Sequence, residues 1–171
     1  MEIILHYARN CFLLFIPIFI WNAVFYRKLP SGYQKPAWDD IPRWLAVAEN
    51  VLRIIVFAFP LMLRFSLTQP VQRAGLVLYC AGTAVYFLSW LVPMLSPASR
   101  WSRGGPGFTA PAHTTIFWLA GVSLIGQETT VGLPYAFYIY GIVCLLFWAV
   151  HTGHACLVFR RRETVPVPKR K

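Results

Sequence analysis

Residues 43–65 read RWLAVAENVLRIIVFAFPLMLRF, a stretch long and apolar enough to cross a lipid bilayer as a helix. Three polar side chains interrupt it: Glu49, Asn50 and Arg53. Ionisable groups at membrane depth are costly, so they usually face a protein interior and mark function. We therefore take this segment as the helix around which the rest of the chain is arranged.

Glu49 precedes Arg53 by four residues, which is the favourable order for an ion pair on one helix face. Asn50 stands three residues before Arg53 and can join the same face. An arginine at the centre of a bilayer costs about 2.5–3.5 kcal/mol on insertion scales, and a partner one turn away lowers that cost. Two interpretations are open: a structural pair that holds the helix against its neighbours, or part of a polar pocket for a ligand, proton or ion.

The composition favours a membrane protein throughout. The chain has 171 residues, of which 57% are hydrophobic and 13% are charged. Soluble domains have about 45–50% apolar and about 25% charged residues. We predict an all-α, polytopic integral membrane protein, a five-helix transmembrane bundle that forms one domain.

Five apolar segments are expected to span the membrane. The fourth is the shortest, because residues 111–126 give only about 24 Å of helix at about 1.5 Å per residue, against a hydrocarbon core of about 30 Å. It must extend to residue 130, or form a short or re-entrant helix. A basic, Pro-containing tail at residues 160–171 is expected to be flexible. The predicted spans are residues 3–25, 43–65, 76–95, 111–130 and 134–159.

The net charge of +10 is unevenly distributed along the chain. With five spans, the side that holds the first loop, the third loop and the C-terminal tail carries 12 bases, and the other side carries three. The positive-inside rule then places the N-terminus outside and the C-terminus in the cytoplasm, with a bacterial inner membrane as the default location. Bases placed this way indicate anionic lipid headgroups as partners, and no nucleic acid.

Polar residues from distant parts of the sequence are expected at one depth. Counted from the inner helix ends, Glu49 and His154 lie about 9 Å deep, His151 about 13 Å and Arg53 about 15 Å. Such a layer predicts a polar pocket open to the cytoplasm, provided that helix rotations bring the side chains together. The candidate lining residues are Glu49, Asn50, Arg53, His151, His154, His113 and Asn22.

Several chemistries fit such a pocket. Zinc accepts His and Glu ligands, and a haem needs axial ligands that face each other, as His113 and His151 would. Glu49 and His151 also suit acid–base chemistry. The chain has no dense metal motif and no G-x-S-x-G elbow, so we expect no metal and no cofactor.

The function that the pattern favours is binding of a lipid-like or small amphipathic ligand in the inner-leaflet pocket. One alternative is a membrane enzyme that acts on a lipid-borne substrate by acid–base chemistry. Another is an accessory subunit of a membrane complex or transporter, in which Glu49 and Arg53 pair with another chain, or a homo-oligomer.

Residues 35–38, Lys-Pro-Ala-Trp, follow the first span. Together with five spans and many tryptophans, they resemble the tryptophan-rich sensory (translocator) proteins. That family continues with further Pro and aromatic residues, whereas Asp-Asp-Ile-Pro follows here at residues 39–42. The resemblance covers four residues and a topology, and no site residue is taken from it.

Overall fold

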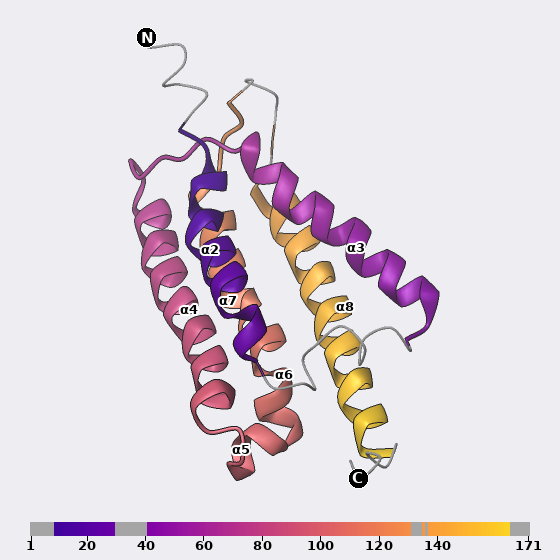
Figure 1. Cartoon of the computed structure of the whole chain (residues 1–171). Helices are drawn as coiled ribbons and strands as arrows, with labels where there is room; N and C mark the ends of the chain where they lie inside the picture. The colour runs from indigo at the N-terminus through magenta and orange to yellow at the C-terminus, as the bar shows by residue number, and fades with distance from the viewer. Residues whose placement is uncertain (1–8, 30–40, 131–134, 136, 165–171) are drawn as a thin grey trace.

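The computed structural model of the chain describes residues 9–29, 41–130, 135 and 137–164 (Figure 1). Within these residues the secondary structure is helical, with isolated bridges and no strands, so the all-α expectation is confirmed. The helices are η1 (Cys11–Phe15), α2 (Ile16–Phe25), η2 (Tyr26–Lys28), α3 (Arg43–Ala58), η5 (Phe59–Leu61), α4 (Pro70–Leu95), α5 (Arg100–Arg103), α6 (Gly105–His113), α7 (Thr115–Ile125) and α8 (Phe137–Thr164).

Five helical segments in the described part are long and apolar enough to cross a membrane. Their number agrees with the sequence-based expectation, and the fourth is the most buried of the five. It has 21 residues, in the two helices α6 and α7 on either side of Thr114. At about 1.5 Å per residue this is about 31 Å of helix, similar to a hydrocarbon core of about 30 Å. The segments are Cys11–Lys28, Arg43–Leu61, Pro70–Leu95, Gly105–Ile125 and Phe137–Arg161.

The first two segments differ from the predicted spans at their ends. The first described helix begins at Cys11, because Asn10 forms a bridge with Arg64 and its side chain caps the helix by accepting a hydrogen bond from the Phe12 amide. The second segment ends at Leu61, where the chain turns into this bridge region. The predicted start of the first span, residues 3–8, lies outside the described residues, as does the Lys-Pro-Ala-Trp segment at 35–38.

The third segment begins six residues earlier than predicted, at Pro70. Pro70 occupies the first helical turn, and Gln69 and Gln72 form a capping box around it. These residues satisfy backbone N–H groups that a helix start leaves unpaired, so a sequence that resembles a turn starts a helix.

The fourth segment is displaced towards the N-terminus, at Gly105–Ile125 in place of 111–130. Its glycines resemble loop residues, but Gly107 lies inside α6, where a Cβ would be 2.1 Å from the Trp101 carbonyl oxygen. The helix ends at Ile125, and Thr129 pairs with Leu63 in a bridge. Gly107 therefore permits close packing of α6 on α5 and does not break the helix.

The last helix, α8, is longer at its C-terminal end than the predicted span, because residues 160–164 of the expected tail are helical. Residues 165–171 of that tail lie outside the described part, as do 131–134 and 136.

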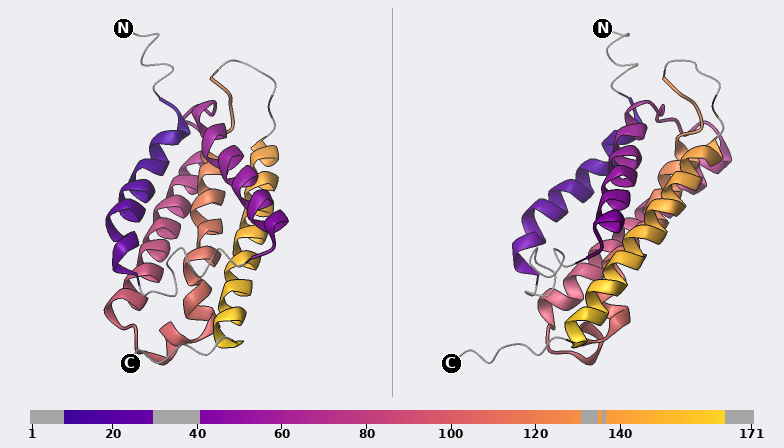
Figure 2. Two further views of the ribbon diagram at one scale, coloured as in Figure 1. Left: turned by 45° about the vertical axis from the view of Figure 1, so that its right-hand side comes forward. Right: turned by 90° about the vertical axis from the view of Figure 1, so that its right-hand side faces the viewer.

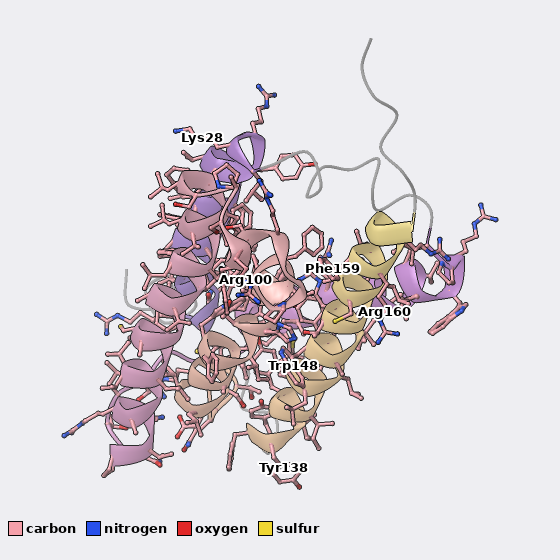
Figure 3. The ribbon with its side chains drawn as sticks, turned by 90° about the horizontal axis from the view of Figure 1, so that it is seen from below. Lys28, Arg100, Tyr138, Trp148, Phe159 and Arg160 are labelled. Atoms are coloured by element: carbon pink, nitrogen blue, oxygen red, sulfur yellow. The ribbon has the colours of Figure 1, made fainter. Side chains whose placement is uncertain are left out.

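The segments alternate in direction along one axis (Figures 1 and 2). At one end, the start of η1 and the end of η5 meet, and Cys11 N donates to Leu63 O over 2.9 Å. The opposite end, which we call the basic end, carries bases from α5, α8, η2 and the start of α3 (Figure 3). Its described bases are Arg27, Lys28, Arg43, Arg100, Arg103, Arg160 and Arg161.

Helices α4 and α7 pack against each other extensively and meet through glycines. A Cβ on Gly82 would be 2.6 Å from Trp118 N, and one on Gly121 would be 2.5 Å from Tyr79 N. At both positions the absence of a side chain lets the two helices approach this closely. On the other side of the bundle, α3 packs on α8 and leaves one face outside (Figure 2). These contacts set how each helix is rotated about its axis.

Candidate functional site

A cavity of about 570 Å³ lies between the five long segments, in the half of the bundle nearer the basic end. Every segment contributes side chains to its wall. The wall includes Asn22 from α2; Glu49, Asn50, Arg53 and Phe57 from α3; Tyr86 and Trp90 from α4; Phe108 and Ala112 from α6; Trp118 from α7; and Phe147, His151, His154 and Ala155 from α8.

Six of the seven candidate residues line this cavity, and the exception is His113. Its neighbours Ala112 and Thr115 face the cavity, whereas His113 lines a second hollow of about 480 Å³ between α6 and α8. One residue turns a helix by about 100°, so a neighbour of a cavity residue can point elsewhere. His113 and His151 therefore line different hollows, and a zinc or haem site that uses both of them is not present in the structure.

The centre of the polar wall is the Glu49 carboxylate, which is 2% exposed. Its Oε1 accepts hydrogen bonds from Arg53 Nη2 on the same helix and from His151 Nδ1 on α8, the latter over 3.0 Å. Its Oε2 bonds His154 Nδ1. The cluster joins α3 to α8 across about a hundred residues of sequence, through the helical spacings i, i+4 on α3 and i, i+3 on α8.

These bonds determine which hydrogen-bonding groups remain for a ligand. An ionised carboxylate only accepts, so both Nδ1 atoms carry a proton in this arrangement. A neutral ring then has its lone pair at Nε2, on the opposite edge. Both oxygens of Glu49 are already hydrogen-bonded. The carboxylate therefore orients Arg53 and the histidines, and these side chains are the groups that a ligand would contact.

Arg53 is the most exposed member of the ionic cluster formed with Glu49, His151 and His154. Its side chain is 42% exposed, and Glu49 is the hydrogen-bond partner that the described residues provide for it. A guanidinium has five N–H donors, so most of them are available to a bound molecule or to water. Asn50 lies next to Glu49 on α3 and is exposed.

A second polar contact lies on the wall formed by α2 and α4. Tyr86 donates a hydrogen bond from its hydroxyl to Asn22 Oδ1 over 2.8 Å, and Trp90 lies one turn further along α4. Sequence reasoning found Asn22 but missed Tyr86 and Trp90, because α4 carries no charge in this region and tyrosine is common in membrane helices. The pairing of Asn22 with Tyr86 joins residues 64 positions apart.

The remaining wall is apolar and mainly aromatic. The Phe147 ring stacks on His151 with centroids 5.3 Å apart and planes 7° apart. Trp118 is 2% exposed, and its indole nitrogen has no hydrogen-bond partner among the described residues. The cavity therefore combines one compact ionic cluster with a broad aromatic surface, which suits a molecule with a polar head and an apolar body.

Among the described residues, no group of three or more His, Cys, Asp or Glu side chains is arranged to hold a metal ion. Both imidazoles of the cluster bond Glu49 through Nδ1.

No protein-family model matches the chain, and no curated protein or solved structure shows significant similarity to it. The short likeness of residues 35–38 to the tryptophan-rich sensory proteins therefore carries no further argument.

Proposed function

We propose that the chain is an integral protein of a bacterial inner membrane whose cavity binds a lipid-like or small amphipathic ligand. The N-terminus lies outside, and the basic end with the C-terminus lies in the cytoplasm. The observation that carries the ligand proposal is the pairing of one buried ionic cluster with an aromatic wall in a single cavity.

The outer surface supports the membrane part of the proposal. Large apolar side chains are exposed on the outward faces of four of the long segments, which is costly in water but favourable in lipid. Examples are Ile20 and Val24 on α2, Val47 and Ile54 on α3, Val77 and Leu88 on α4, and Ile142 and Leu145 on α8.

The orientation rests on the positive-inside rule applied to the described bases. The basic end carries seven of them, whereas the opposite end carries Arg9, Arg64 and Arg73, of which Arg64 pairs with Glu128. Anionic headgroups of the inner leaflet are the expected neighbours of the basic end.

The size of the cavity supports binding of a small molecule. Its volume of about 570 Å³ falls within the range of about 300–1,000 Å³ typical of ligand sites. All five segments contribute to it, so a bound molecule would contact the whole bundle. In the proposed orientation the cavity lies in the cytoplasmic half of the membrane, where an inner-leaflet amphiphile has access to it.

The test is native mass spectrometry of the protein released from mild detergent, after exposure to a total lipid extract of its host membrane. The wild type should retain a discrete small mass. Ala155→Leu, which fills the cavity, should lose that mass. Ala149→Leu, an exposed position on the same helix, is the matched control and should keep it. A wild-type protein that stays bare, or a mass that persists in Ala155→Leu, would overturn the proposal.

One observation favours a second candidate, a membrane enzyme acting on a lipid-borne substrate. The hydrogen bond between Glu49 and His151 Nδ1 leaves the other edge of a cavity-lining imidazole for proton transfer. In an enzyme, Glu49→Gln should abolish turnover and leave ligand affinity largely intact. In a binding protein, the affinity itself should fall.

An accessory subunit of a membrane complex is the other interpretation of the pair. That interpretation needs Glu49 and Arg53 to pair with another chain, whereas here they pair with each other and with α8. Loss of a co-purifying partner upon Arg53→Ala is the result that would favour it.

A further inference from the structure

The shared oxygen of Glu49 brings two different hydrogen-bonding groups side by side at the cavity wall. Arg53 Nη2 and His151 Nδ1 both bond Oε1, and both side chains line the cavity. A guanidinium offers only donors, and a neutral imidazole already bonded through Nδ1 offers an acceptor at Nε2. The wall therefore presents a fixed cation beside a proton acceptor.

The charges at the cavity show which headgroup suits this pair. Among the described residues that line it, the charged and titratable groups are Glu49 and Arg53 from α3, His151 and His154 from α8, Tyr86 from α4, and Tyr26 from η2. Ionised Glu49 and Arg53 cancel. A bound cation would face Arg53, and a bound anion alone would add an uncompensated charge at membrane depth, which is costly.

A neutral carboxylic acid avoids both penalties. It enters without net charge, and its O–H proton passes to Nε2 of neutral His151. The products are a carboxylate beside the Arg53 guanidinium and an imidazolium beside Glu49. The O–H bond breaks, an N–H bond forms, and the total charge is unchanged. Each new charge then has an opposite charge next to it, with charge-assisted hydrogen bonds that are stronger than neutral ones.

The rest of the cavity fits the body of such an acid. Phe57, Phe147 and Trp118 lie on the walls around the ionic cluster. Phe147 also stacks on His151, and a ring face next to an imidazolium is electrostatically favourable. A hydrocarbon or aromatic body would bury its apolar surface against these rings.

We infer that the ligand is an amphipathic carboxylic acid, with its headgroup between Arg53 and His151 and its acidic proton held by His151. This inference rests on the proposed function, since it assumes that the cavity binds an amphiphile. It adds the class of the headgroup and the place of the proton.

The first experiment compares three probes of equal chain length on the wild-type protein in mild detergent: dodecanoic acid, dodecan-1-ol and dodecylamine, measured by native mass spectrometry titration. We expect the acid to bind at least about tenfold more tightly than the other two. Equal binding of all three would overturn the acid inference and leave cavity binding intact. Binding of none would overturn the proposed function itself.

Variants test which residue causes the preference for the acid. Arg53→Gln should remove the preference for the acid while the alcohol still binds. Arg161→Gln, an exposed arginine at the end of α8, is the matched control and should keep the preference. Should Arg53→Gln fail to fold, Arg53→Lys retains the charge and is expected to keep a weaker preference. A full preference in folded Arg53→Gln contradicts the inference.

The protonation state of the bound carboxyl group is measured by infrared spectroscopy of dodecanoic acid with a ¹³C-labelled carboxyl group. In the wild type the bound probe should show the carboxylate stretching bands, whereas in His151→Phe it should show the carbonyl band of the protonated acid. A protonated acid in the wild type would overturn proton transfer to His151, even if the acid is bound tightly.

Discussion

At the scale of single residues, Glu49 is the group on which the cavity depends most. A buried carboxylate with three hydrogen-bonding partners is stable because its charge is compensated, and removal of one member of such a cluster leaves the others uncompensated. Glu49→Gln should therefore lower the free energy of unfolding by about 3 kcal/mol. The measurement is reversible unfolding in mild detergent followed by circular dichroism.

The control for Glu49 is Glu128, which among the described residues is the other acidic side chain with an ion pair. It lies 3.7 Å from Arg64 and is 57% exposed. Glu128→Gln should change the stability by less than about 1 kcal/mol. An equal loss of stability in both variants would show that the buried cluster stabilises the fold no more than an exposed ion pair does.

Tyr86 allows a smaller test at the same scale. Tyr86→Phe keeps the ring but removes the donor to Asn22, so the expected loss is about 1 kcal/mol of stability. Tyr138→Phe, with an exposed ring on α8, should be silent. Both variants are compared by thermal unfolding. If Tyr86→Phe leaves the stability unchanged as well, the hydrogen bond between Tyr86 and Asn22 does not stabilise the packing of α2 on α4.

At the scale of elements, the contact of α4 with α7 depends on the absence of side chains. Gly121→Ala would put a Cβ 2.5 Å from Tyr79 N, which forces the two helices apart. Overpacking of this kind costs about 1–3 kcal/mol, and the thermal midpoint should fall. Since α4 and α7 both line the cavity, we also expect weaker ligand retention.

Gly153 on α8 is the matched control, because a Cβ there has nothing within 4 Å. Gly153→Ala should keep or raise the thermal midpoint, since alanine is favoured over glycine in a helix by about 1 kcal/mol. A fall in Gly153→Ala equal to that in Gly121→Ala would contradict close packing as the cause, because a Cβ at Gly153 meets no neighbouring atom.

At the scale of the whole molecule, the proposed orientation is open to a direct test. Ala98→Cys lies at the basic end and Glu128→Cys at the opposite end, each in a variant that lacks Cys11, Cys80, Cys144 and Cys156. A membrane-impermeant maleimide on intact cells should label Glu128→Cys and spare Ala98→Cys. The reverse labelling pattern would show that the protein has the opposite orientation in the membrane.

The fourth segment shows why helix ends were harder to predict than helix number. Gly105, Pro106 and Gly107 resemble a loop when read locally. Their helical conformation depends on α5, whose Trp101 carbonyl lies where a side chain at Gly107 would be. Such a contact joins separate elements, and local propensity does not contain it.

The sequence by itself determined that the chain is helical, that five segments can cross a membrane, and that Glu49 and Arg53 form a pair. Length, hydropathy and i, i+4 spacing are local properties, so no knowledge of the fold was needed. Only the tertiary structure decided that His151 and His154 reach Glu49, that Asn22 meets Tyr86, and that His113 points into another hollow. These outcomes depend on helix rotation, which is set by close contacts between helices far apart in sequence.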